Sequence, residues 1–143
     1  MADLDSLIRY RKHAVDEKRR MLAKLYEQAE SMAQAKKELE EKLEEETRIA
    51  HEIGTAESYS DLGNYSVAMK KKIKGFGDSI KEMDVRIAAA QEDMRAAFAE
   101  LKKIEITQRN REEREEAEIK RKEDIELGEI ALDGYRRALE EEE

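Results

Sequence analysis

A seven-residue apolar repeat between residues 69 and 104 constrains the fold of this chain more than any other feature of its sequence. The repeat alternates spacings of three and four through Met69, Ile73, Phe76, Ile80, Met83, Ile87, Ala90, Met94, Ala97, Leu101 and Ile104. An amphipathic helix on a globular core usually has a broader apolar stripe. A strict seven-residue repeat keeps a narrow stripe facing a partner helix and imposes a left-handed supercoil, so the sequence predicts a coiled coil here.

The composition fits long helices and leaves little material for a compact core. Of the 143 residues, 45% are charged and 5% are aromatic, and the chain contains neither proline nor cysteine. An enzyme pocket needs apolar walls around a few polar groups, and such walls are scarce here. Because cysteine is absent, a disulfide framework and a thiolate metal site are both excluded.

Residues 54–64 (GTAESYSDLGN) form the one stretch rich in turn-forming residues. This stretch divides the chain into two helical segments. We therefore expect a single coiled-coil rod over 1–143, with a first helix over about 3–53, a loop over about 54–64 and a second helix over about 65–139. Asp61 or Asn64 is the expected cap of the second helix, because a short side-chain oxygen accepts a hydrogen bond from a free backbone N–H there.

The apolar pattern of the first helix is less regular. One seven-residue frame takes in Leu4, Leu7, Ala14, Met21, Leu25, Met32, Ala35, Leu39, Ile49 and Ile53. Polar residues interrupt this frame, and Ile8, Val15, Leu22 and Leu43 lie one position beyond it. We therefore expect the stripe to drift around the helix with the 3.6-residue period of a helix that does not supercoil.

Folding the two segments back on each other gives the simplest assembly, an all-α antiparallel coiled-coil hairpin whose second helix is longer than the first. Pairing about the loop sets Leu4 opposite roughly residue 114, so the second helix outruns the first by about 25 residues, or roughly 35–40 Å. The repeat turns polar after Ile104, and apolar residues return at Ile106, Ile119, Ile125, Leu127, Ile130, Leu132 and Leu139. A partner that covers this overhang would account for them.

Residues that would carry catalysis are nearly absent. The pair Gly75 and Gly77 lies inside the apolar repeat without the sequence that follows a phosphate-binding loop, and neither His13 nor His51 stands in a metal-binding motif. We therefore expect no catalytic, cofactor-binding or metal-binding residues. A net charge of −8 argues against binding to nucleic acid. No apolar run is long enough to insert directly into a bilayer.

Two features near the loop are candidates for partner binding. They are a basic cluster, Lys70, Lys71 and Lys72, and an apolar cluster, Tyr59, Leu62 and Tyr65. The basic cluster is either a solubilising face or a dock for an acidic partner. The apolar cluster is either a binding anchor or, at Tyr65, a staple that fixes the start of the second helix.

Two segments of the chain resemble the flagellar export protein FliJ family, in the form found in alphaproteobacteria. They are LDSLIRYRKHAVDEKRR, near the start, and MRAAFAELKKIEITQRNREEREEAEIKR, in the second half. Within them, the runs VDEKRR and ELKKIE carry most of the specificity. The resemblance covers nearly the whole chain, including the central break.

The resemblance implies a two-helix coiled coil similar to the central stalk of rotary ATPases, in the cytoplasmic type III export apparatus of the flagellum. Proteins of this family insert the end that carries both termini into the hexameric export ATPase, contact the export gate membrane protein, and cycle export chaperones. The resemblance thus implies a cytoplasmic, nonenzymatic protein that associates peripherally with the membrane through the export apparatus. A stalk of this kind is expected to be a monomer when isolated.

Site residues follow from the same resemblance. The candidate ATPase-binding residues are Leu4, Leu7, Ile8, Arg9, Arg11, Lys12, Ile119, Ile125, Leu127, Ile130 and Tyr135. The candidate residues for the export gate or another partner are Tyr59, Leu62, Tyr65, Lys70, Lys71 and Lys72. The gate-contact patch of the family matches Tyr65, Met69, Ile73 and Phe76 best, and the apolar repeat buries the last three, which leaves Tyr65 at the surface.

The residues leave two other interpretations open. In the first, the chain is a structural scaffold that self-associates through residues 117–140. In the second, it is a holdase-like chaperone that binds partners through loose helix ends.

Overall fold

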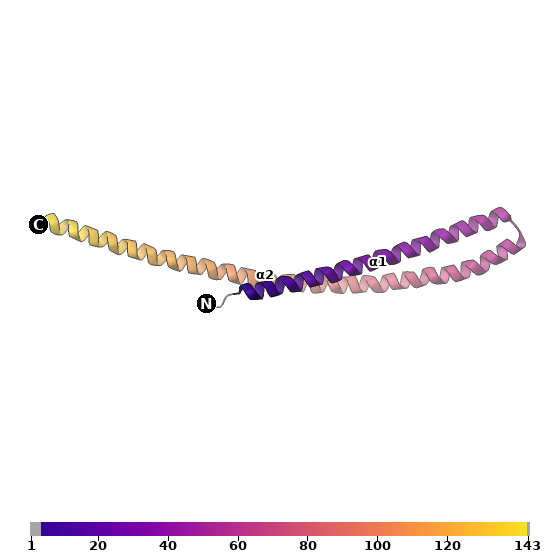
Figure 1. Cartoon of the computed structure of the whole chain (residues 1–143), viewed down its shortest axis with the longest axis horizontal. Helices are drawn as coiled ribbons and strands as arrows, with labels where there is room; N and C mark the ends of the chain where they lie inside the picture. The colour runs from indigo at the N-terminus through magenta and orange to yellow at the C-terminus, as the bar shows by residue number, and fades with distance from the viewer. Residues whose placement is uncertain (1–3, 143) are drawn as a thin grey trace. The chain divides into compact units, whose positions relative to one another are not determined.

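The computed structural model describes residues 4–142 as two long helices packed against each other as a hairpin (Figure 1). Helix α1 spans Asp5–Ile53 and helix α2 spans Ala56–Glu142. The predicted all-α hairpin with a longer second helix is confirmed. Asp3, the expected start of the first helix, lies outside the described residues. Two compact units divide the chain: one comprises Lys12–Phe98, and the other joins the residues up to Arg11 with those from Ala99 onward.

A two-residue turn, Gly54 and Thr55, joins the helices. Gly54 has a φ of 69°, which side-chain-bearing residues rarely adopt, and its N–H donates a hydrogen bond to the carbonyl of Ala50 at 3.0 Å. This is the usual left-handed glycine ending of a helix. Thr55 and Ser58 then form a reciprocal cap, in which each side-chain oxygen accepts a hydrogen bond from the other residue's backbone N–H, at 3.1 and 3.2 Å.

The expected loop over residues 54–64 is therefore wrong in its extent, because α2 already begins at Ala56. The expected caps, Asp61 and Asn64, lie inside α2, and Thr55 is the cap instead. The turn-forming residues of this stretch misled the prediction because several of them occupy the first turns of a helix. The Ser58 hydroxyl also lies 3.1 Å from the carbonyl of Ala50, which ties the start of α2 to the end of α1.

The apolar repeat of α2 lies on its packed face, as predicted. Met69, Met83, Ile87, Ala90 and Leu101 are buried, and the other six members of the repeat are half-buried. In the unit Lys12–Phe98, a cluster formed by Leu22, Met83, Ile87 and Ala90 makes the core, with Leu25, Ala29, Met32 and Met94 packed against it. Residues 65 or so apart in sequence thus meet across the hairpin.

The packed face of α1 is regular and agrees with one of the two rows of the frame expected from the sequence, while its other row lies one residue beyond the expected one. Val15 and Leu22 are buried, whereas Met21 is 54% exposed and Ile53 is 59% exposed. The packed positions are Leu4, Ile8, Arg11, Val15, Lys18, Leu22, Leu25, Ala29, Met32, Lys36, Leu39, Leu43 and Ala50, and Ala14, Ala35, Thr47 and Ile49 beside them are also half-buried. The expected drift is therefore wrong. The long cationic side chains of Arg11, Lys18 and Lys36 occupy part of this face, which hides the repeat from a search for apolar residues.

Polar contacts support the register of the two helices. The side-chain amide of Gln91 donates a hydrogen bond to the Tyr26 hydroxyl at 2.6 Å across the hairpin. On the surface, ion pairs join residues three or four apart on one helix, such as Arg48 with Glu45 and Glu52. Each exposed pair of this kind stabilises the fold only slightly.

The short turn makes opposite predictions for two glycine substitutions. Gly54→Ala forces a side chain into a left-handed conformation and is expected to lower the free energy of unfolding by about 1 kcal/mol. Gly63 lies in α2, and a Cβ added there meets no atom within 4 Å. Gly63→Ala is therefore expected to raise the free energy of unfolding by about 1 kcal/mol. Urea unfolding followed by circular dichroism measures both. Destabilisation by both substitutions would contradict a turn that ends at Thr55.

The position of the packed face of α1 predicts different costs for two neighbouring residues. Leu22→Ala removes a side chain that is 8% exposed, and is expected to lower the free energy of unfolding by about 2 kcal/mol or more. Met21→Ala alters an exposed side chain and is expected to change the free energy of unfolding by less than about 0.5 kcal/mol. Thermal and urea unfolding distinguish these outcomes, and a larger loss for Met21→Ala would restore the frame expected from the sequence.

Candidate partner-binding site

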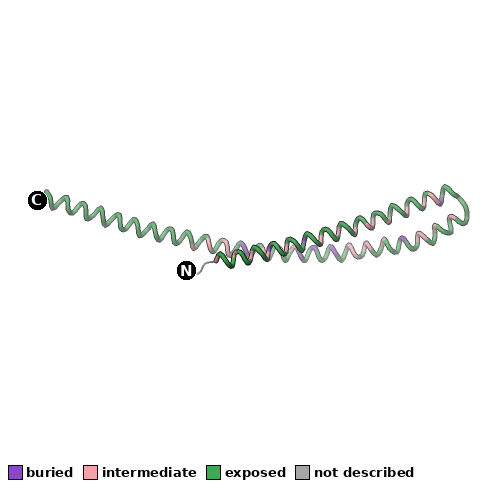
Figure 2. The backbone as a smooth tube through the Cα atoms, viewed as in Figure 1, coloured by how far each residue is buried: buried purple, intermediate pink, exposed green. Residues whose placement is uncertain are grey.

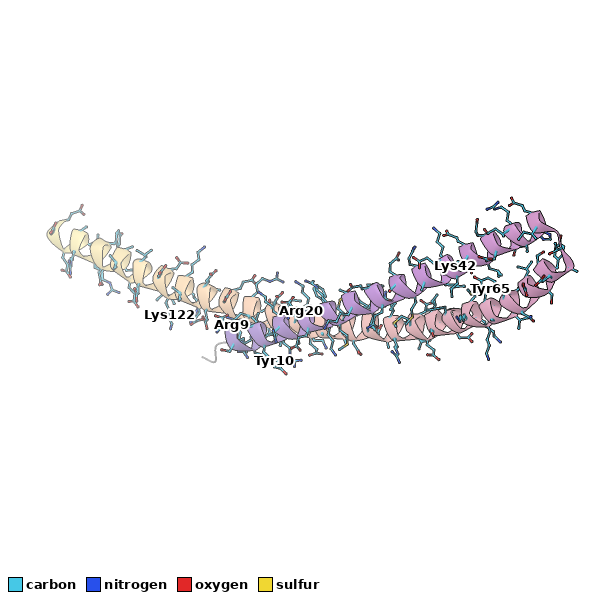
Figure 3. All side chains as sticks on the ribbon, turned by 45° about the vertical axis from the view of Figure 1, so that its right-hand side comes forward. Arg9, Tyr10, Arg20, Lys42, Tyr65 and Lys122 are labelled. Atoms are coloured by element: carbon cyan, nitrogen blue, oxygen red, sulfur yellow. The ribbon has the colours of Figure 1, made fainter. Side chains whose placement is uncertain are left out.

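The part of α2 over residues 112–142, here called the free segment, has no residue that is buried or even half-buried (Figure 2). Arg111 is the last half-buried residue of α2. A helix of this length extends for about 45 Å. The exposed Lys122 is one of its residues (Figure 3). The free segment is thus longer than the overhang of about 25 residues expected from the sequence, since it begins slightly earlier and continues helical to Glu142.

Large apolar side chains are exposed on the free segment. Exposed fractions range from 47% to 67% for Ile119, Ile125, Leu127, Ile130, Leu132, Tyr135 and Leu139. Single exposed apolar residues are ordinary, but a group of seven on one unpartnered helix is typical of an interaction site. Leu132 and Leu139 were not among the predicted site residues, although their spacing of seven from Ile125 is a signal that pointed to them.

The predicted ATPase-binding residues of α1 are only partly exposed. Leu4 and Ile8 are half-buried and Leu7 is 41% exposed. Arg9 and Lys12 are exposed. The predicted residues near the start of the chain therefore combine packing positions with a cationic surface, whereas the candidates on the free segment are all exposed.

Arg11 is the most constrained of the predicted cations. It is half-buried, and its Nε atom is buried without a hydrogen-bond partner. Its guanidinium carbon lies 5.9 Å from the centre of the Tyr10 ring, within range of a cation–π interaction. Arg11 therefore contributes to packing within its unit as much as to any surface.

The candidates near the turn line a shallow groove instead of forming an exposed tip. This groove has a volume of about 360 Å³ and is lined by Glu46, Ile49, Ala50, Ile53, Ser58, Asp61, Leu62 and Tyr65. Leu62 and Tyr65 are half-buried in it, so the expected exposure of Tyr65 is only partial. The groove residues Ile49 and Ile53 on α1 were missed, because only the fold brings them next to α2.

Tyr59 packs at the same end of the hairpin. Its hydroxyl lies 3.1 Å from Nδ1 of His51, and the two rings meet edge to face with centres 5.2 Å apart. Tyr59 is 44% exposed, so it joins the two helices while keeping part of its ring in solvent. Nearby, a hydrogen bond and the charge of Glu45 raise the pKa of Arg48 above its usual value.

The basic cluster Lys70, Lys71 and Lys72 is exposed on α2. Three consecutive helical residues spread over about 200° of the circumference, so the cluster surrounds the helix instead of forming one flat face. Met69 is buried, and Ile73 and Phe76 are half-buried, as the apolar repeat predicts. The family's gate-contact patch therefore coincides here with packing positions, apart from Tyr65.

The described residues offer no sign of a metal centre or a membrane span. Over residues 4–142, no group of three or more His, Asp or Glu side chains is placed to hold a metal ion. Neither α1 nor α2, as far as the structure describes them, is long and apolar enough to cross a bilayer.

A coiled-coil hairpin whose second helix is longer than the first and ends in exposed residues defines the class of this molecule. The model of the family described as flagellar FliJ protein matches residues 1–140, so the chain belongs to that family. No curated protein and no solved structure matches the chain. Membership makes it a non-enzymatic structural component of flagellar type III export, associated with the export ATPase complex. The alphaproteobacterial form stays a prediction.

Proposed function

We propose that this chain is a stalk that binds the hexameric ring of the flagellar export ATPase through the free segment of α2 and the first residues of α1. The observation that carries the proposal is the exposure of every residue over 112–142, including seven large apolar side chains, in a member of a flagellar export family. A helix with apolar residues on several sides fits an environment that surrounds it, as the inside of a ring does.

The chain would act on the ring by binding, while the ring hydrolyses ATP. Ile119 and Leu127 lie on different sides of the helix from Leu132, since successive residues turn by about 100°. A ring of subunits can therefore contact the free segment from several directions at once. Binding energy spent on this contact favours the assembled ring over separate subunits, which is how a rod promotes assembly or turnover.

We also place the protein in the cytoplasm, associated peripherally with the membrane through the export apparatus. Contact with the export gate and with export chaperones belongs to the same proposal. The groove beside the turn, which includes Leu62 and Tyr65, supports one such contact, because it offers apolar side chains between Glu46 and Asp61. The exposed Lys70–72 cluster offers a cationic surface on the same helix.

The test is a titration of the purified chain into the export ATPase of the same organism, with ATP turnover and particle size followed together. We expect stimulated turnover and ring formation, both lost when residues 117–143 are deleted. A monodisperse, helical protein that neither binds nor stimulates the ATPase would overturn the proposal.

Point substitutions make the same titration more specific. Ile119→Asp combined with Ile130→Asp alters side chains that are 57% and 67% exposed, so we expect the free energy of unfolding to change by less than about 0.5 kcal/mol. Stimulation of the ATPase is expected to fall about tenfold. The matched control is Val67→Asp with Val85→Asp, two exposed residues of α2 outside the free segment. An equal loss in this control would contradict a site on the free segment.

A further inference from the structure

Residues 125–139 of the free segment separate apolar from charged side chains almost completely. The charged members are Glu126, Glu129, Asp133, Arg136 and Arg137, and every other residue is apolar or glycine. At about 100° per residue, the charged side chains occupy roughly a third of the helix circumference and the apolar ones occupy the rest. This stretch is therefore far more amphipathic than a solvated helix end requires.

One stripe on this apolar face has the spacing of a coiled-coil seam. Ile125, Gly128, Leu132, Tyr135 and Leu139 follow one another at intervals of three, four, three and four residues. The four large side chains are between 47% and 65% exposed. The stripe is thus complete in sequence and unpartnered in the hairpin.

Gly128 is the one small residue of this stripe. A Cβ added at this position would meet no atom within 4 Å, and the residue lies inside α2. Glycine in a helix costs about 1 kcal/mol relative to alanine. No neighbouring atom within 4 Å explains why glycine stands here. A glycine in a seam admits a large side chain or a close backbone from another helix.

The stripe is complementary to itself when two copies run antiparallel. A register that sets Leu132 beside Tyr135 of the second copy also sets Gly128 beside Leu139, so that a large residue meets a small one. The same register places Glu129 next to Arg136 on the flank of the seam, twice by symmetry. These flanking positions fix orientation in coiled coils through their charges.

The glutamates that follow the stripe disfavour the parallel orientation. A parallel pair sets Glu140, Glu141 and Glu142 beside the same glutamates of the second copy, whereas the antiparallel register above sets them beside Ile125, Glu126 and Leu127. The acidic residues on the polar face disfavour an anionic membrane surface as the occupant.

We propose that residues 125–139 pair antiparallel with the same residues of a second copy, so that the free protein is a dimer joined through its free segments. This replaces the monomer expected from the sequence. Where the free segment enters the ATPase ring, as proposed above, the ring displaces the second copy. The dimer is then a resting form in which the apolar stripe is covered until the ATPase is available.

The first test is sedimentation equilibrium of the full chain, without ATPase, over a series of concentrations. We expect reversible dimers, and a dissociation constant raised about tenfold or more by Leu132→Asp. The matched control is Ile119→Asp, which alters an exposed isoleucine on the opposite side of the helix and is expected to leave the dimer intact. A monomeric wild-type chain, or equal losses in both variants, would overturn the proposal.

A charge exchange tests the orientation without changing the apolar stripe. Glu129→Arg and Arg136→Glu are each expected to weaken the dimer several-fold, and the double variant is expected to restore it, because these two residues are seven apart in one chain and meet only across copies. Circular dichroism checks that each variant stays helical. Failure of the double variant to recover, with helicity intact, would contradict the antiparallel register.

Cross-linking gives an independent readout, because the chain has no cysteine of its own. Equal amounts of Glu129→Cys and Arg136→Cys proteins are mixed and oxidised. We expect the mixed disulfide to exceed either self-linked product by far more than the roughly twofold excess that random pairing of equal amounts gives. A preference for self-linked Glu129→Cys would indicate parallel pairing and overturn the proposal. Since none of these measurements contains the ATPase, their failure leaves the stalk proposal untouched, and failure of the stalk proposal leaves them untouched.

Discussion

The packing of two narrow apolar stripes along the hairpin is the interaction on which the rest of this structure depends. In the unit Lys12–Phe98, its core is a small set of side chains around Leu22, Met83 and Ile87, and no large side chain is fully buried there. Many modest contacts therefore have to add up along the helices. The turn helps by fixing where the pairing starts, through the left-handed Gly54 and the reciprocal cap of Thr55 and Ser58.

The end of this packing leaves the last part of α2 exposed. The apolar repeat of α2 ends at Ile104, and beyond Arg111 no side chain of α2 is covered. Apolar residues nevertheless return along the free segment, where all of them are exposed. The exposure of seven large apolar side chains on this segment supports a role in binding other proteins. Membership in the flagellar FliJ family gives that role its setting in flagellar export.

The sequence predicted the α2 repeat correctly because eleven apolar positions in strict spacing leave no other frame. It misplaced one of the two rows of packed positions on α1 by one residue, since Arg11, Lys18 and Lys36 occupy packed positions that a hydrophobic pattern does not register. It made the loop too long, because the capping pair Thr55 and Ser58 is hidden among turn-forming residues. Of the candidate site, the exposed residues of the free segment could be named from sequence, but the groove beside the turn depends on which residues of α1 face α2.

Hydrogen exchange measured by mass spectrometry tests the central claim most directly, which is that the free segment exists to be covered by the export ATPase. In the dilute free protein, amides over residues 112–142 are expected to exchange much faster than those over 69–104, because no packing protects them. Addition of the export ATPase is expected to slow exchange over 112–142 and to leave 69–104 unchanged. Protection confined to the 69–104 region, or no change along the whole chain, would contradict the account.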